Sequence, residues 1–176
     1  ITTTSTYKNY LKEIKNRQIP YGVLKAGDTV TLVEGVPFQV VGPVKAAEDS
    51  RGNPDLNNCS VVGRLTYGKF SMLFTGDAEK EEENSILQQY RGQLKSDVLK
   101  VGHHGSRTSS GPSFLAAVRP GAAVISAGAG NSYGLPHDVT LANLKKISAL
   151  VYRTDRDGTV SIDTDGVNYH IMKEHS

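Results

Sequence analysis

The sequence predicts a single α/β domain, which some classification schemes would place with α+β folds. Helix and strand patterns alternate through the middle of the chain, and its buried strands end in polar or glycine-rich loops. A length of 176 residues suits one domain better than two. Hydrophobic residues make up 38% and charged residues 22%, which are ordinary globular values and exclude a disordered chain.

Charge and cysteine content narrow the functional classes. The formal net charge of +2 is too small to attract polyanions by itself, although a local basic patch still could. The single cysteine, Cys59, excludes a disulfide framework and a zinc site built from thiolates. No apolar run approaches 18 residues, so we expect no membrane span and a soluble chain.

The first third of the chain predicts one helix, two strands and a loop. Apolar and aromatic residues recur at helical spacing over Tyr7–Ile19, which predicts a helix with one buried stripe. Two short strands are expected at Thr29–Val33 and Phe38–Val41. The polar segment Lys45–Asn58, with glycine and proline inside it, is typical of a surface loop.

The remainder alternates strands with helices. The clearest local signal is a hairpin, because two strand patterns are joined by the dipeptide Gly68-Lys69. The expected strands are Ser60–Tyr67, Phe70–Phe74, Asp97–Val101, Ala122–Ser126, Leu150–Thr154, Thr159–Asp163 and Val167–Met172. The expected helices are Ala78–Tyr90, Pro112–Val118 and Val139–Ile147.

Three polar loops follow predicted buried strands. They are Thr75–Asp77, Gly102–Ser110 and Gly128–His137. Functional sites in α/β sheets lie beyond the carboxyl ends of the strands, so we expect these loops to converge on one cleft.

Asp77 allows two interpretations. A carboxylate after Gly76, where a strand gives way to a helix, could bridge metal ions or orient a base. It could equally be the N-cap of the following helix, since aspartate accepts hydrogen bonds from the first free amides.

The adjacent His103 and His104 also leave alternatives open. On extended backbone their side chains would point in opposite directions, so one could face a metal and the other a substrate oxygen. They could also be ordinary surface histidines. The polar run from Gly105 to Ser110 suits an anion such as phosphate, or forms a simple polar turn. For His137, helix capping or solvent exposure competes with a place in the cleft.

The order of these motifs resembles a known family. Asn57-Asn58-Cys59-Ser60 before the hairpin, and Leu73-Phe74-Thr75-Gly76-Asp77 after it, resemble the second half of a metallo-β-lactamase-fold hydrolase. The motifs Asp97–Ser110, Val124–Gly128 and Asn131–Gly134 are similar to the hydrolase domain of ComEC-type competence proteins, which take part in DNA uptake. This resemblance implies an αββα sandwich with a two-metal cleft.

The resemblance also implies roles for individual residues. Asp77 falls on the metal-bridging aspartate of the family and would be catalytic. His104 would bind a metal, and His103 would contact the phosphate and assist catalysis. Asn57 and Ser60 fall where many relatives carry another metal histidine, and they would contact substrate here. Further substrate contacts are expected from Ser106, Arg107 and Asn131.

The chain also departs from the family pattern. The signature His-x-His-x-Asp-His is absent, since the first histidine is His103, and Leu135 stands where many relatives have histidine. We therefore expect residues 1–176 to be a partial domain that lacks the N-terminal part with this motif. Two divalent ions, zinc or manganese, would bind the complete domain, and this chain alone would bind none or bind them weakly.

The expected function follows from the resemblance. It is metal-dependent phosphodiester hydrolysis, as a nuclease domain linked to DNA uptake that is inactive as this fragment. One alternative is a non-catalytic nucleic-acid-binding module using Lys100 and Arg107, and another is a hydrolase resembling phosphorylcholine esterases.

The resemblance also implies partners. They are single-stranded DNA or another phosphodiester, the N-terminal remainder of the domain, and the membrane channel domain of a bacterial parent protein, placing this domain outside the cytoplasm. Self-association of the fragment is also expected.

Overall fold

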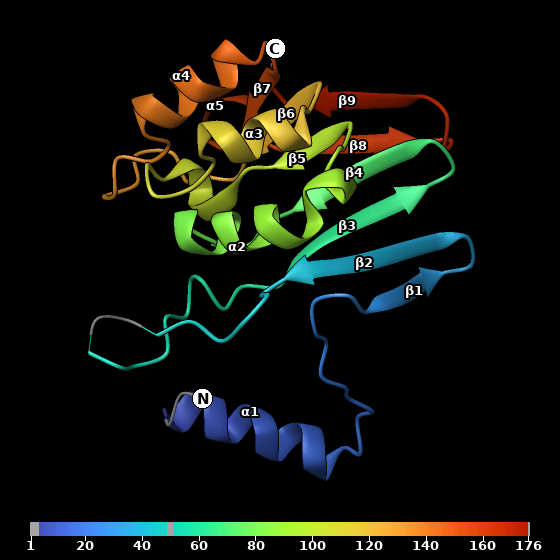
Figure 1. Ribbon diagram of the computed structural model, residues 1–176, viewed down its shortest axis with the longest axis vertical. Helices are drawn as coiled ribbons and strands as arrows, with labels where there is room; N and C mark the ends of the chain where they lie inside the picture. The colour runs from blue at the N-terminus through green and yellow to red at the C-terminus, as the bar shows by residue number, and fades with distance from the viewer. Residues whose placement is uncertain (1–3, 49–50, 176) are drawn as a thin grey trace.

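The computed structural model describes residues 4–48 and 51–175, arranged around one seven-stranded sheet (Figure 1). The strands lie side by side in chain order. They are β1 (Thr29–Val33), β2 (Val36–Gly42), β3 (Val62–Tyr67), β4 (Phe70–Phe74), β5 (Val98–Lys100), β6 (Ala122–Ile125) and β7 (Leu150–Arg153).

The direction of the strands changes halfway across the sheet. Strands β1 to β4 pair antiparallel, whereas β4, β5, β6 and β7 pair parallel. The carboxyl ends of β4, β5 and β6 therefore lie together at one edge, which is the edge expected to carry the site.

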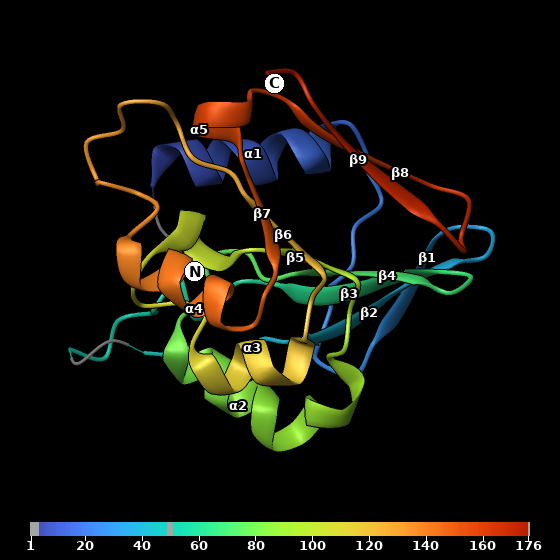
Figure 2. The same cartoon turned by 90° about the horizontal axis from the view of Figure 1, so that it is seen from above.

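Three helices cover one face of the sheet: α2 (Lys80–Tyr90), α3 (Pro112–Val118) and α4 (Asp138–Lys146) (Figure 2). Each contributes to the same apolar cluster as the strands. Fully buried members include Leu73 and Leu99 from the sheet, with Ile86, Phe114 and Leu144 from the helices. This packing fixes the strand ends that precede the polar loops.

A two-stranded sheet packs on the opposite face. Strands β8 (Val160–Thr164) and β9 (Tyr169–Lys173) pair antiparallel and cover a second cluster that includes Phe70 and Val98. The rings of Phe70 and Tyr169 lie 5.3 Å apart. The helices, main sheet and second sheet together confirm the predicted α/β class.

The predicted elements are found with small shifts at their ends. The hairpin β3–β4 and helix α3 lie where the sequence predicts them. Three short helical turns were not predicted: η1 (Arg91–Gln93), η2 (Gly102–Gly105) and α5 (Thr154–Asp157). The predicted loop Lys45–Asn58 is a loop where it is described, and positions 49 and 50 lie outside the described residues.

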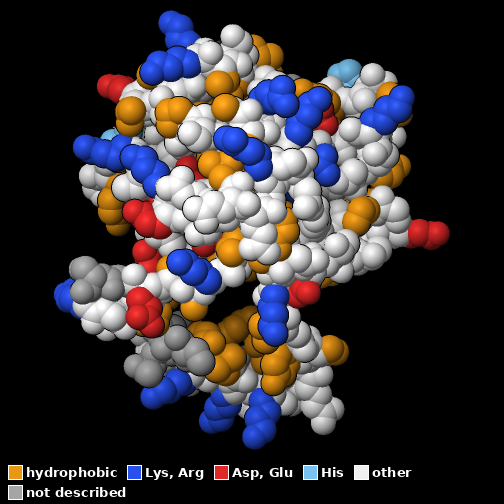
Figure 3. All heavy atoms as spheres, in the orientation of Figure 1, with side chains coloured by type: hydrophobic (Ala, Val, Ile, Leu, Met, Phe, Trp, Pro, Cys, Tyr) orange, Lys and Arg blue, Asp and Glu red, His pale blue; other side chains and the backbone are white. Residues whose placement is uncertain are grey.

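The first helix differs from expectation in its burial. Helix α1 (Ser5–Asn16) overlaps the predicted range but begins two residues before it and ends three residues before its end, with Thr4 as the N-cap; none of its residues is buried. Tyr10, Leu11 and Ile19 are exposed, and Figure 3 shows hydrophobic side chains gathered around α1. The predicted buried stripe is therefore wrong. The self-association expected from open apolar faces stays a prediction.

Helix length bears on the membrane question. Across residues 4–48 and 51–175, no helix is both long enough and apolar enough to cross a bilayer.

A buried carboxylate joins α2 to α3. Glu83 is 3% exposed, and its two oxygens accept hydrogen bonds from the backbone amides of Ser110 and Gly111, at the start of α3. Desolvation of the charged form raises the pKa of Glu83 to about 7, and the two amides partly oppose this rise. Glu83 therefore holds the end of the Gly102–Ser110 loop, although burial of its charged form is unfavourable.

This burial predicts a pH-dependent stability. The folded state holds the Glu83 proton up to about pH 7, whereas the unfolded chain releases it near 4.5. The free energy of unfolding of the wild type, relative to Glu83→Gln, should therefore fall as pH rises between these values. We expect a fall of up to roughly 3 kcal/mol. Urea unfolding from pH 4 to 8 measures it, and a difference independent of pH would contradict this assignment.

Candidate functional site

Four segments meet at the carboxyl edge of β4, β5 and β6. Three are the predicted loops, which follow those strands in turn. The fourth is Asn57–Ser60, which precedes β3 and reaches the same edge because β3 runs antiparallel to β4. The structure thus brings the predicted loops together.

The backbone before Asp77 is shaped by a close approach to Ser60. Gly76 has φ of +51°, and a Cβ there would lie 2.8 Å from the Ser60 Cβ, so a larger side chain would not fit. The Asp77 amide donates to the Ser60 hydroxyl at 3.0 Å. Ser60, expected to touch substrate, therefore supports the turn that presents Asp77.

Asp77 does not cap helix α2, so the N-cap interpretation is wrong. The side-chain oxygen of Asn58 accepts from the amides of Glu79 (3.0 Å) and Glu82 (3.3 Å) instead. Asn58 is 2% exposed and is itself held by Asp55. Since the free helix amides are satisfied from another loop, the Asp77 carboxylate is left half-exposed at the sheet edge.

The two histidines occupy an unusual turn. His103 (φ +46°, ψ +47°) and His104 (φ +54°, ψ +23°) are both left-handed, not extended as the sequence interpretation assumed. Gly105 follows with φ of +83°, where a Cβ would lie 2.5 Å from the Pro136 Cβ. The two ring centroids lie 6.4 Å apart. Two consecutive left-handed non-glycine residues are a costly conformation of the kind that is concentrated at functional sites.

His104 faces Asp77 with a defined tautomer. Its Nδ1 lies 2.8 Å from the Ser126 carbonyl oxygen, which can only accept, so Nδ1 carries the proton. Its Nε2 lies 3.7 Å from Asp77 Oδ1. In the neutral ring, Nε2 therefore offers a lone pair beside a carboxylate, which is the donor arrangement of a metal-ligating histidine.

His103 faces a different carboxylate, that of Glu79. Its Nδ1 lies 3.0 Å from Glu79 Oε1, and both side chains are largely buried. The same oxygen accepts from Thr108 Oγ1 (3.0 Å) and from the Asn57 side-chain amide (3.2 Å). Glu79 is thus a hub that orients His103.

The sequence analysis does not single out Glu79, because a glutamate at the start of a helix is most simply part of a solvated face. The position two residues after Asp77 was the available signal. Asn57, expected to bind substrate, contacts Glu79 in the structure.

The polar loop after the histidines holds Arg107 at the surface. The Ser106 hydroxyl is buried and lies 2.9 Å from Thr108 Oγ1, so its contact is inside the protein. The Arg107 amide donates to His137 Nδ1 at 3.1 Å, so Nε2 of that ring carries the proton and cannot accept from the guanidinium 3.2 Å away. His137 therefore holds the backbone of Arg107, whose exposed guanidinium is available to an anion.

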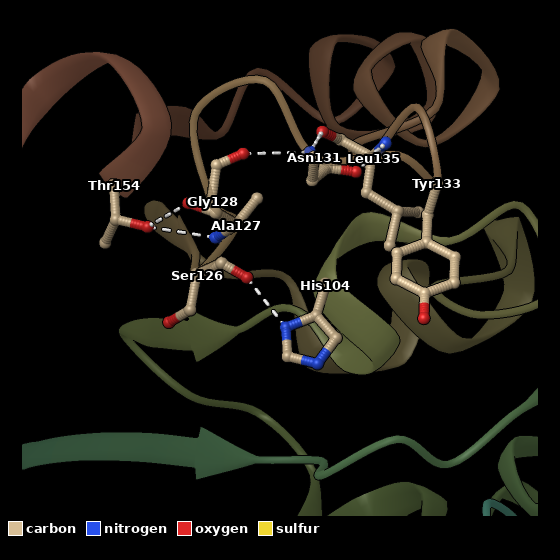
Figure 4. A pocket seen from close by; sticks show the side chains of 8 residues that line it. All are labelled: His104, Ser126, Ala127, Gly128, Asn131, Tyr133, Leu135 and Thr154. Atoms are coloured by element: carbon tan, nitrogen blue, oxygen red, sulfur yellow. Dashed lines mark hydrogen bonds between the residues drawn. The ribbon is translucent and has the colours of Figure 1, made fainter.

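The loop after β6 carries Asn131. Its side-chain amide donates to the carbonyls of Gly128 (2.9 Å) and Leu135 (2.7 Å), and its oxygen accepts from the Leu135 amide (3.0 Å). Figure 4 shows this loop beside His104, with a pocket between them. Asn131, expected to contact substrate, uses its hydrogen-bonding groups within the loop.

A lysine adds positive charge near the carboxylate. Lys100, at the end of β5, donates from Nζ to the Val101 carbonyl at 3.0 Å. Burial lowers the pKa of Lys100, and the nearby charge of Asp77 partly opposes this shift. Lys100 and Arg107 therefore add positive charge to the same end of the sheet as the carboxylates of Asp77 and Glu79.

The donors in the described part of the chain do not make up a two-metal centre. Asp77 and His104 lie close enough to share an ion, but a catalytic zinc takes three protein ligands, and two ions need more. Nowhere in residues 4–48 and 51–175 do three or more His, Cys, Asp or Glu side chains gather so that they could hold an ion. His103 is directed to Glu79 instead.

Comparison with known proteins identifies relatives. No protein-family model matches the chain. It is 39% identical over 137 residues to "ComE operon protein 3" of Bacillus subtilis, which covers 78% of this chain and 17% of that protein. It is 38% identical to "Competence protein ComA" of Neisseria gonorrhoeae, covering 72% and 18%, and 35% identical to "Recombination protein 2" of Haemophilus influenzae, covering 74% and 16%.

A solved structure is also similar in part. A protein named as a metal-dependent hydrolase from Parabacteroides distasonis overlays with a TM-score of 0.49 at 18% identity, covering 84% of this chain and 62% of that chain. We infer no activity from this overlap. The chain spans only 16% to 18% of the length of the competence relatives. At 35–39% identity, the chain is homologous to one segment of the competence proteins of the ComEC family.

Proposed function

We propose that this chain supplies part of the active site of a phosphodiester hydrolase that acts on single-stranded DNA. One observation carries the proposal: the oriented pair His103–Glu79 lies beside the facing pair Asp77–His104, on one edge of the sheet. Two histidines with different carboxylate partners can take different roles. The competence names of the relatives favour DNA as the substrate.

His103 has the arrangement of a proton donor or phosphate ligand. The Glu79 carboxylate accepts from Nδ1–H, and in the imidazolium form of the ring Nε2–H is left to donate to a substrate oxygen. Hydrolysis of a phosphodiester forms a bond from a water oxygen to phosphorus, with loss of a water proton to solvent, and breaks the bond from phosphorus to the leaving oxygen, which would take the Nε2 proton. A positioned imidazole contributes about 10²–10⁴-fold to such a step.

Arg107 and the adjoining loop would hold the phosphate. His137 holds the Arg107 backbone, and the exposed guanidinium is matched to the oxygens of an anion. In this assignment Asn57, Ser60 and Ser106 act through the protein, by fixing the segments that carry Glu79, Asp77 and Arg107. Asn131 likewise fixes the loop that carries His137.

Divalent ions would require ligands beyond this chain. Asp77 and His104 would contribute two donors, and the others would come from a further segment with the His-x-His-x-Asp-His pattern. We propose zinc or manganese as the ion, residues 1–176 as a partial domain, and a membrane-channel parent as its context.

Extension of the chain tests this proposal. A protein that adds such a histidine segment at the N-terminus should cleave single-stranded DNA in the presence of Mn²⁺ or Zn²⁺. Asp77→Ala should lower cleavage by more than about 100-fold, because it removes a proposed metal ligand. Asp163→Ala is the matched control, since Asp163 is exposed on β8, outside the site. Fluorescent oligonucleotides resolved on gels measure the rate.

Two results would contradict the proposal. One is an extended, metal-loaded protein that leaves single-stranded DNA intact, and the other is cleavage that Asp77→Ala does not change. Binding without cleavage would instead favour a nucleic-acid-binding module.

The role of Glu79 is tested by a double-mutant cycle in the same extended protein. Glu79→Gln should lower kcat about 10–100-fold, since it weakens the bond that orients His103. In a His103→Ala background the same change should have little further effect, because the two residues act as one unit.

Glu81→Gln provides the matched control for Glu79, as Glu81 is an exposed glutamate on the same helix. Equal losses from Glu79→Gln in both backgrounds would show that Glu79 does not act through His103. Thermal unfolding of each variant separates a loss of fold from a loss of orientation.

A further inference from the structure

A pocket adjoins the site but none of the proposed chemistry uses it. It has a volume of about 450 Å³ and lies between the His104 ring and the loop after β6 (Figure 4). Ala127, Tyr133 and Leu135 contribute apolar surface to it. Its size falls within the range of small-molecule and cofactor sites, which are mostly apolar with few polar groups.

Two polar side chains that line this pocket, Asn131 and Thr154, are occupied by backbone groups, which leaves the hydroxyls of Ser126 and Tyr133 and one nitrogen of His104. Both the nitrogen and the oxygen of the Asn131 side chain are hydrogen-bonded to the backbone of Gly128 and Leu135. The Thr154 hydroxyl donates to the Ala127 carbonyl and accepts from the Ala127 amide, both at 2.9 Å. Few groups remain to read the edge of a ligand, so an occupant would be recognised by its flat apolar faces.

Tyr133 supplies an aromatic ring at this pocket. It is 79% exposed, although it is a large aromatic residue. In Figure 4 the side chains of Tyr133 and Leu135 extend from the loop toward the side of the pocket on which His104 lies. The bonds of Asn131 hold this loop, so the ring is presented on a defined scaffold. Exposed aromatic rings beside cationic groups are the platforms on which the bases of single strands stack.

His104 joins the pocket to the proposed phosphate site. Its Nδ1 is fixed by the Ser126 carbonyl, its Nε2 is directed toward Asp77, and its ring lines the pocket. A phosphate near Asp77 would therefore place the rest of its nucleotide next to Tyr133. Phosphate and base are linked through one sugar, so neighbouring anion and stacking sites suit one nucleotide.

We propose that this pocket receives a nucleobase of single-stranded nucleic acid, stacked on Tyr133. This inference rests on the proposed function and adds the part of the substrate that it recognises. Because stacking on a ring uses the face that every base has, we expect this recognition to depend little on base identity. Tyr133 is a binding residue in this account, not a catalytic one.

Binding of two oligonucleotides to residues 1–176 tests the proposal without any need for cleavage. One is a fluorescent ten-nucleotide oligothymidylate, and the other has the same phosphates and sugars without bases. Fluorescence anisotropy at low salt, in EDTA, gives both dissociation constants. We expect the oligothymidylate to bind more tightly. Tyr133→Ala should weaken its binding about fivefold to 100-fold and leave the abasic strand unchanged.

Two variants control this experiment. Tyr133→Phe keeps the ring and should bind like the wild type. Tyr21→Ala removes a tyrosine that is 83% exposed in the segment after α1, and it should change neither dissociation constant. Circular dichroism of each variant verifies the fold.

The proposal is overturned if both oligonucleotides bind equally, if neither binds, or if Tyr133→Ala weakens both to the same extent. If both oligonucleotides bind equally and Arg107→Ala weakens both, the base-binding proposal fails while the proposed phosphate site stands. Failure of the proposed hydrolysis would instead appear in the cleavage assay with the extended protein, so the two failures are distinguishable.

Discussion

The site depends on one backbone constraint, the left-handed turn at His103 and His104. Were this segment extended, the two rings would point to opposite sides, and only one could reach the edge where Asp77 lies. The close packing of Gly105 against Pro136 and the bond from His104 to the Ser126 carbonyl hold the turn. Each histidine can then face its own carboxylate, Asp77 or Glu79. A conformation that costs energy is thereby stabilised by the loops it organises.

Strand order and loop position could be predicted from the sequence, whereas the hydrogen bonds between loops could not. Polar loops after buried strands indicated where Asp77 and the histidines would converge, because parallel strands end at one edge. The capping of α2 by Asn58 was not predictable, since its partners lie 21 and 24 residues away. Glu79 could not be singled out for a related reason: a glutamate at the start of a helix is usually solvated, and only the tertiary structure places His103 beside it. The burial of α1 was predicted wrongly because spacing shows which face is apolar but not what covers it.

The structure separates two parts of a hydrolytic site that sequence motifs present as one. The residues proposed to orient a substrate phosphate lie together in this chain, with Glu79 holding His103 and His137 holding the backbone of Arg107. Within residues 4–48 and 51–175 the donors placed to share an ion are Asp77 and His104, which are too few for the ions of a two-metal hydrolase. Phosphate orientation would therefore be a property of this segment, and ion binding a property of a larger assembly.

The central claim is that Asp77, His103 and His104 face one phosphodiester. A crystal structure of the histidine-extended protein with Mn²⁺ and a non-hydrolysable phosphorothioate dinucleotide tests it most directly. Our account predicts anomalous density for manganese within bonding distance of Asp77 and His104, with the phosphorothioate next to His103 Nε2. Manganese bound away from Asp77, or a dinucleotide bound on another face of the sheet, would contradict it.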